Sequence, residues 1–354
     1  MEEAIKKMLK SQKAGDQSTN VQAESITINQ GITYSEVREI VLDIFHSNFA
    51  QLSEKASIIA RDRAKEITDT FLKKLEAQNY NGIANAQDPD FQYALFTIQK
   101  EYARNGDKDL GDLLVDLLVD RTKYDRRTIL QIVLNESLSV APKLTSDQLA
   151  TLSIVFLINY AMFNGLKDLP TFLNFLDTYF APFANLLSKN RSCYQHLEFA
   201  GCGSVGMGEF DILNSLKKNY QGLFSKGFNE EEIDKMHIKL SDFPLLFTYC
   251  LHDTNIKQIN ALNEIVLKDI AKNSGVSEQA LNILISLNNN FSMSNEEIRD
   301  YIIRERGYMK NVFEVWKNSL MKNLTLTSVG IAIGHANIKR NLNIEFADLS
   351  IWIN

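Results

Sequence analysis

Residues 34–75 read YSEVREIVLDIFHSNFAQLSEKASIIARDRAKEITDTFLKKL. Apolar residues recur there at steps of three and four, which places them on one face of an amphipathic helix. These positions are Val37, Val41, Ile44, Phe45, Phe49, Leu52, Ala56, Ala60, Ala64, Ile67, Phe71 and Leu75. A break near Ser47-Asn48 divides the region into two expected helices. Because the repeat lacks four clean heptads, packing within the subunit and coiled-coil assembly both remain open.

Helical patterns continue through most of the chain. We expect helices at about 90–104, 109–121, 126–139, 146–164, 168–184, 209–220, 229–236, 256–273, 277–289, 295–305 and 309–321. Asp88, Ser146 and Asp168 are the expected N-caps of three of them. Only five Pro and 16 Gly occur among 354 residues, which favours helices over a turn-rich β architecture. The sequence therefore predicts a mainly α fold with a multi-helix body.

The two ends of the chain depart from this pattern and suggest four parts. Leu324–Leu326 alternates briefly, Thr327 can cap a further helix, and Ile344–Ile353 is rich in β-branched and aromatic residues. Three helices, a short strand and a closing strand predict a small winged-helix-like C-terminal module. We expect residues 1–32 to form a helix and a β assembly tag, 33–78 a long amphipathic helical region, 79–276 a helical core domain and 277–354 the winged-helix-like module.

The tag is the stretch from Ala14 to Asn29, which alternates like a β-strand. A single strand leaves half its backbone groups unpaired, so it needs a partner, and copies of the same segment are the simplest one. We therefore expect homo-oligomers in which polar side chains form ladders between subunits and apolar ones pack in the middle. The residues are Asp16, Ser18, Asn20, Val21, Gln22, Ile26 and Ile28. A solvated linker is the alternative.

Composition limits the function classes. The net charge of −6 and a pI near 5.5 argue against a broad nucleic-acid surface. Three cysteines and an N-terminus without an apolar core indicate a cytoplasmic protein. The most apolar run, Leu149–Phe163, is too short for a membrane span and is interrupted by polar residues. We expect no membrane span, no cofactor and no metal.

The segment from Arg191 to Gly206 holds three candidate motifs. Gly201-Cys-Gly203-Ser-Val-Gly206 has the spacing of a dinucleotide-binding loop, with Leu197–Ala200 as a possible preceding strand, but the second strand is missing. Cys193, His196 and Cys202, with Cys250 and His252, contain zinc-ligand types without the spacing of a common zinc finger. A tight turn and buried thiols are the ordinary interpretations of these two patterns.

The third motif, Arg191-Ser-Cys-Tyr-Gln-His196, reads R-x4-H and resembles the motif of the helical HEPN nucleases. The resemblance implies a metal-independent RNase in which Arg191 holds the scissile phosphate and His196 acts on the ribose hydroxyl across a dimer interface. The planar guanidinium and the near-neutral titration of imidazole suit these roles. A surface arginine with a histidine packed at a helix end is the alternative.

A third functional hypothesis is a DNA-binding regulator that uses the C-terminal module. The basic residues available are Lys339 and Arg340, together with Lys317 and Lys322. Four basic residues are few for phosphate contacts, so nucleic acid is possible as a partner but is not favoured.

The stretch Lys13-Ala-Gly-Asp-Gln-Ser-Thr-Asn-Val-Gln-Ala23, followed by Ile26-Thr-Ile28, resembles a tag found near the N-termini of assorted bacterial proteins, many among presumed anti-phage or abortive-infection genes. With Tyr34–Ile40, His196–Cys202 and Leu326–Gly330, the whole chain is similar to an uncharacterised bacterial family with this tag. Leu326–Gly330 also resembles the closing segment of a helical abortive-infection family. The resemblance implies a defence context. Together with the tag it leads us to expect a self-associating, non-enzymatic protein whose partners are copies of itself and a phage or host protein.

Overall fold

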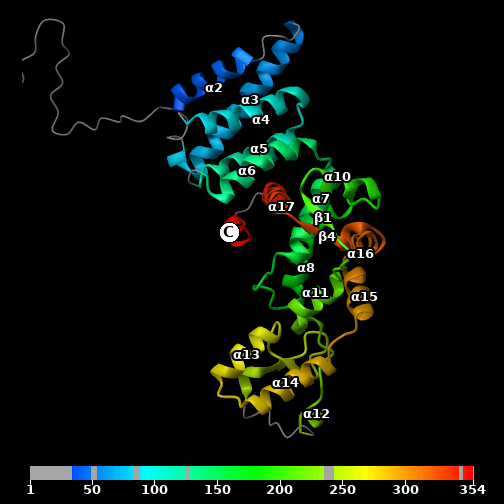
Figure 1. Cartoon of the computed structure of the whole chain (residues 1–354). Helices are drawn as coiled ribbons and strands as arrows, with labels where there is room; N and C mark the ends of the chain where they lie inside the picture. Colours follow the sequence, from blue (N-terminus) through cyan, green and yellow to red (C-terminus); the bar gives the residue numbers. More distant parts are fainter. Residues whose placement is uncertain are drawn as a thin grey trace, which may run out of the picture.

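The computed structural model describes residues 34–48, 54–82, 88–124, 127–234, 243–342 and 346–353. Figure 1 shows the helices stacked into an elongated, curved body, with α2–α6 at one end and α12–α14 at the other. The mainly α fold is confirmed, and the strands of the described residues are short. None of the helices in these ranges has the length and apolar character needed to cross a membrane.

The first end of the body is a stack of helices. They are α2 (Tyr34–Asn48), α3 (Glu54–Gln78), α4 (Pro89–Asn105), α5 (Lys108–Arg121) and α6 (Ile129–Val140). The two helices expected within residues 34–75 are confirmed, and their apolar face packs inside the chain, where α3 contacts α2, α4 and α5. Val37, Ile67 and Phe71 are fully or almost fully buried there. Burial within the subunit therefore accounts for the helical apolar pattern.

The largest apolar core runs from the helix stack into the middle of the body. The elements of the middle are α7 (Ser146–Asn159), α8 (Leu169–Tyr179), α9 (Ala181–Ala184), α10 (Arg191–Phe199), β1 (Gly203–Val205), α11 (Ile212–Asn219), α15 (Asn295–Glu305), α16 (Met309–Asn318), β4 (Leu324–Leu326) and α17 (Ser328–Leu342). Strands β1 and β4 pair antiparallel, with Gly203 opposite Leu326. This pair joins two segments that lie more than a hundred residues apart in the sequence.

The other end has a small apolar core of its own. It is formed by α12 (Glu230–Asp234), β2 (Phe247–Tyr249), β3 (Lys257–Ile259), α13 (Glu264–Asn273) and α14 (Glu278–Asn290). Strands β2 and β3 pair antiparallel, with Phe247 opposite Ile259. The helix expected over 256–273 is therefore wrong at its start, because residues 257–259 form a strand that buries Gln258 and Ile259.

Most expected helix boundaries agree with the structure to within a few residues. Asp88 and Asp168 are confirmed as N-caps, because their carboxylates accept backbone N–H groups at the starts of α4 and α8. The N-cap of α7 is Thr145, one residue before the expected Ser146. Leu197–Ala200 is not a strand: it forms the end of α10 and the turn that follows.

Helix α17 passes through the seam between the helix stack and the middle core, where it packs on α5, α6 and α7 (Figure 1). Residues from Gly330 to Lys339 are buried. Two glycines one turn apart permit this close approach. A Cβ atom on Gly330 would lie 1.8 Å from the carbonyl oxygen of Cys202, and one on Gly334 would lie 2.8 Å from that of Leu152. Only glycine allows the backbones to come this close.

The winged-helix-like module expected over 277–354 is not confirmed, because its elements separate in space. Helix α14 belongs to the small core, β4 pairs with β1, and α17 lies in the main seam. The closing strand is wrong over residues 346–353, where Leu349–Ile351 forms a 3₁₀ turn. Packing also crosses the expected boundary at 79, because α3 packs on α4 and α5. The division into four parts stays a prediction from the sequence.

We expect Gly330→Ala to lower the free energy of unfolding by about 2 kcal/mol or more, because the added methyl group overlaps a backbone carbonyl that cannot move aside. Alanine is otherwise the better helix former, so a loss identifies the steric cause. Urea unfolding followed by circular dichroism measures the change. Gly307→Ala is the control, because a Cβ there meets no atom within 4 Å. Equal stabilities for the two variants would contradict this account of the seam.

Candidate functional site

A row of acidic residues follows one face of α5. Asp109, Asp112, Asp116 and Asp120 recur at steps of three and four. The first two are exposed, but α3, α4, α6 and α17 surround the second half of the helix, where Asp116 and Asp120 are 0% and 5% exposed. Two buried carboxylates one turn apart require nearby cations, because an unpaired charge is very unfavourable in an apolar core.

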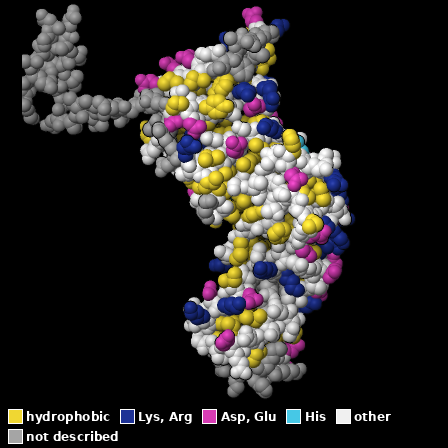
Figure 2. Space-filling view, in the orientation of Figure 1, with side chains coloured by type: hydrophobic (Ala, Val, Ile, Leu, Met, Phe, Trp, Pro, Cys, Tyr) yellow, Lys and Arg dark blue, Asp and Glu magenta, His cyan; other side chains and the backbone are white. Residues whose placement is uncertain are grey.

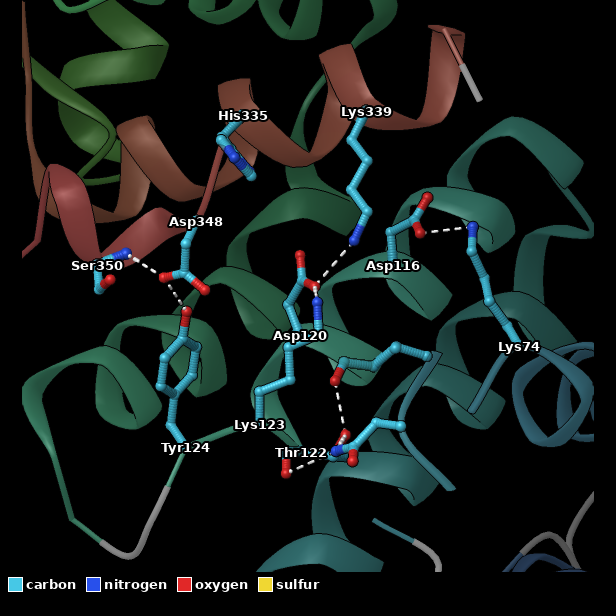
Figure 3. A network of polar contacts seen from close by, with 12 residues as sticks. Lys74, Asp116, Asp120, Thr122, Lys123, Tyr124, His335, Lys339, Asp348 and Ser350 are labelled. Atoms are coloured by element: carbon cyan, nitrogen blue, oxygen red, sulfur yellow. Dashed lines mark hydrogen bonds and ion pairs between the residues drawn. The ribbon is translucent and has the colours of Figure 1, made fainter. Parts of the chain in front are cut away.

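Lysines from two other helices supply these cations (Figure 3). The Lys74 ammonium of α3 lies 2.5 Å from the Asp116 carboxylate. The Lys339 ammonium of α17 lies 2.9 Å from the Asp120 carboxylate, which also pairs with Lys123 at 2.7 Å. The ion pairs therefore connect α3, α5 and α17. We call Lys74, Asp116, Asp120, Lys123 and Lys339 the ionic clamp.

The two carboxylates of the clamp differ in their electrostatics. Burial raises the pKa of Asp116, and the attraction of Lys74 only partly offsets it. Apart from the ion pair with Lys74, neither oxygen of Asp116 has a hydrogen-bond partner among the described residues. Burial would also raise the pKa of Asp120, but Lys339 and Lys123 outweigh it and hold that pKa below its ordinary value. Asp120 is therefore the well-compensated charge and Asp116 the poorly compensated one.

One turn before Lys339, His335 connects α17 to the C-terminal segment. Its Nε2 lies 2.7 Å from the carbonyl oxygen of Ala347, and burial lowers its pKa. A neutral imidazole with hydrogen on Nε2 satisfies this contact, while Nδ1 has no hydrogen-bond partner among the described residues. Next in the segment, Asp348 accepts a hydrogen bond from the Tyr124 hydroxyl at 2.9 Å. The C-terminal segment is thus fastened to α17 and to the turn after α5 (Figure 3).

These groups are engaged with one another and hold α17 in place. Helix α17 follows directly after β4, and its cap residue Thr327 bonds to the turn that leads into β1. The ionic clamp therefore fixes the position of α17, and α17 in turn fixes the β1–β4 pair at the surface.

Helix α10 and β1 form a rigid platform at that surface. The Thr327 hydroxyl donates a hydrogen bond of 2.6 Å to the carbonyl of Gly201, which has a φ of +76°. The Glu198 carboxylate accepts a hydrogen bond of 3.0 Å from the backbone N–H of Val205. These bonds tie the end of α10 to β1 and β4.

Two large exposed apolar side chains flank β1 in the sequence. Phe199 is 88% exposed and Met207 is 100% exposed. The Phe199 ring stacks against His196 with a centroid distance of 6.4 Å. We call Phe199 and Met207 the apolar tip. Aromatic residues and methionine are enriched at protein interfaces, so the tip is a candidate recognition surface.

The proposed nuclease residues lie beside the tip. Arg191 is exposed in the first turn of α10, and His196 is half-buried near its end. Five helical residues separate two side chains by about 140°, so the pair does not converge within one chain. His196 Nδ1 contacts the Gln148 side-chain amide at 2.9 Å. A catalytic role for Arg191 and His196 stays a prediction.

The zinc constellation does not assemble. Among the described residues, no group of three or more His, Cys, Asp or Glu side chains could hold a metal ion. Burial raises the pKa values of Cys193 and Cys202 to about 12, which disfavours thiolates. Cys250 contacts the carbonyl of Ser225 at 3.6 Å, and His252 contacts that of Leu223 at 2.8 Å.

The glycine motif is not a dinucleotide loop either. A helix precedes it, and its Gly203 starts β1, where a Cβ would lie 2.8 Å from the carbonyl oxygen of Thr325. The motif serves strand pairing, whereas a dinucleotide loop runs from a strand into a helix.

The basic residues of the DNA-binding hypothesis are largely paired. Lys339 is buried on Asp120, Arg340 pairs with Asp109 at 2.8 Å, and Lys322 pairs with Glu209 at 2.8 Å. On the face shown in Figure 2, acidic and basic side chains are interspersed. This arrangement does not favour phosphate binding. The predicted oligomerisation residues between Asp16 and Ile28 lie outside the described residues.

Sequence reasoning missed both the ionic clamp and the apolar tip. The regular spacing of the aspartates on α5 can be seen in the sequence, but acidic residues at helical spacing usually face solvent. Phe199 lies in a helix, where a phenylalanine is ordinarily expected to face the core. Neither burial nor exposure of a single side chain can be read without the tertiary packing.

Comparison with known proteins gave one match. A protein-family model matches residues 31–353, and its description names no activity. Neither the curated proteins nor the solved structures gave a match.

We expect Lys339→Met to lower the free energy of unfolding by about 3 kcal/mol, because it leaves Asp120 buried with Lys123 as its remaining cation. The pKa of Asp120 should rise, so the loss should be largest at neutral pH and should shrink as the pH falls and the carboxylate is protonated. Urea unfolding at several pH values measures both effects. Lys55→Met is the control, because Lys55 is exposed on α3. A loss that does not change with pH would contradict the electrostatic explanation.

Asp116→Asn should act in the opposite direction. A raised carboxyl pKa in the folded state means that wild-type stability falls as the pH rises from the unfolded pKa towards the folded one. Asparagine removes this loss, so the variant should be more stable than wild type at pH 7 and about as stable at pH 4. The same urea series measures the gain, with exposed Asp62→Asn as the control. A lower stability of Asp116→Asn at pH 7 would show that the Lys74 pair dominates.

Proposed function

We propose that this chain, which belongs to the family whose model matches residues 31–353, is a self-associating bacterial protein of phage defence or abortive infection. In this proposal it acts by assembly and partner recognition, without catalysis of its own. The N-terminal tag joins copies of the chain, and the apolar tip contacts a phage or host protein. The location would be the cytoplasm.

The apolar tip is the observation that carries the recognition part of the proposal. A phenylalanine 88% exposed and a methionine 100% exposed are unfavourable in water, and here they flank a hydrogen-bonded strand pair. A rigid mount loses little conformational entropy when a partner binds, so such side chains make efficient anchors. Phe199 also lies within His196–Cys202, one of the stretches on which the family resemblance depends.

The assembly part rests on the alternation and family resemblance of residues 14–29. Identical strands from several subunits can pair through their backbone groups and align their polar side chains. Helix α2 is the first described helix after this segment. It lies at the outer end of the helix stack, whereas α17 lies beyond α6 at the other end of the stack. Assembly through the tag would therefore leave the platform of α10 and β1 available to a partner.

Deletion of residues 14–30 should convert the oligomer to a monomer of about the mass of one chain, because the paired strands are lost. Size-exclusion chromatography with light scattering measures the mass. Replacing Ile26 and Ile28 with serine should weaken assembly, while replacing Thr27 and Asn29 on the other face with serine should weaken it less. An unchanged mass after the deletion rules out tag-driven assembly.

Phe199→Ser combined with Met207→Ser should abolish phage protection in cells while leaving the unfolding midpoint nearly unchanged, because both side chains are exposed. Plaque counts on bacteria that express each variant measure protection. Ile265→Ser is the matched control, since it replaces another exposed apolar residue at the far end of the body. Full protection by the double variant would contradict recognition through the tip. RNA cleavage that depends on Arg191 and His196 would instead support the nuclease alternative.

A further inference from the structure

A cavity of about 570 Å³ lies between the loop after α7, helix α8 and the C-terminal segment. It is separate from the clamp and from the tip. Its volume falls within the range of about 300–1,000 Å³ that is usual for small-molecule sites. The C-terminal segment forms one wall through Phe346, Ala347 and Trp352.

The interior of the cavity is aromatic. The ring of Phe163 lies 4.6 Å from those of Phe175 and Tyr179, centre to centre, and both rings are tilted by more than 50° from it. Phe346 lies 6.0 Å from Tyr179 and stacks on Trp352 at 6.1 Å. Rings from three separate segments thus surround one space, which suits a flat apolar or aromatic group.

The rim of the cavity is polar and uncharged. Helix α8 places Thr171, Asn174 and Thr178 along one face at steps of three and four, and Asn164 lies on the loop opposite. Each asparagine amide offers both a donor and an acceptor, and each threonine hydroxyl can do either. None of the described residues that line the cavity is Asp, Glu, Lys, Arg or His.

This combination restricts the ligand. An anionic or cationic group would lose water in the cavity without gaining an opposite charge, which is unfavourable. A purely apolar ligand would leave the amides without partners. A neutral ring that carries both donors and acceptors satisfies the aromatic walls and the amide rim together.

We propose that this cavity binds a small uncharged heteroaromatic molecule of the nucleoside class. The ring stacks on the aromatic wall that Phe163, Tyr179 and Trp352 present to the cavity, and Asn174 hydrogen-bonds to its edge. The sugar hydroxyls face the exposed rim at Asn164. This site is independent of the proposed assembly function, since it uses neither the tag nor the tip.

Isothermal titration of the full chain with adenosine, guanosine, cytidine and uridine tests the proposal, together with saturation-transfer NMR to identify the contacting ring protons. At least one nucleoside should bind, and its 5′-monophosphate should not bind more tightly, because its phosphate gains no cation among the described lining residues. Asn174→Ala should weaken binding about tenfold, which corresponds to the loss of about 1.4 kcal/mol. Asn282→Ala is the matched control, because Asn282 is an exposed helical asparagine on α14.

Four results would overturn the proposal. They are no binding of any nucleoside at millimolar concentration, tighter binding of a monophosphate, tighter binding of choline than of any nucleoside, and binding that Asn174→Ala leaves unchanged. Phe163→Leu serves as a second variant that keeps an apolar side chain in the wall. It should also weaken binding, and an unfolding measurement shows whether the fold is intact.

Discussion

The buried ion pair between Lys339 and Asp120 is the constraint on which the rest of the structure depends. It is 2.9 Å long and joins α17 to α5 in the seam between two groups of helices. A charge in such a place is tolerable only where its partner is fixed, so the pair selects one position of α17 along its axis. The two glycines of α17 then allow the backbone to lie directly on α7 and on the turn at Cys202. The ion pair therefore fixes the position of α17 along its axis, and the two glycines permit its short distance to the neighbouring backbone.

That position has consequences at the surface. Because β4 leads straight into α17, fixing the helix also fixes the strand, and β1 pairs with it. The turn at Gly201 and the hydrogen bond that the Val205 N–H donates to Glu198 then determine the positions of Phe199 and Met207. The candidate recognition surface is therefore the exposed end of a chain of contacts that begins in the core.

The helical content could be predicted from the sequence, because apolar spacing, N-caps and few prolines all act locally. Asp88, Asp168 and the two helices within 34–75 illustrate this. The C-terminal arrangement could not, since Leu324–Leu326 pairs with a strand that precedes it by more than a hundred residues. Thr327 was a correct helix cap, but nothing in its neighbourhood shows that the helix enters the core. The same limit applies to the site. The spacing of Asp116 and Asp120 is typical of exposed helical residues, although both are buried. A phenylalanine in a helix is typical of a core, although Phe199 is exposed.

The place of α17 in the chain also bears on how the protein folds during synthesis. Its residues leave the ribosome after those of α5, α6 and α7, yet they pack against all three of these helices. Until α17 has been made, α5, α6 and α7 therefore keep an open apolar seam, and Asp120 lacks its ion pair with Lys339. A truncated product would keep that seam exposed and become a substrate for chaperones and proteases.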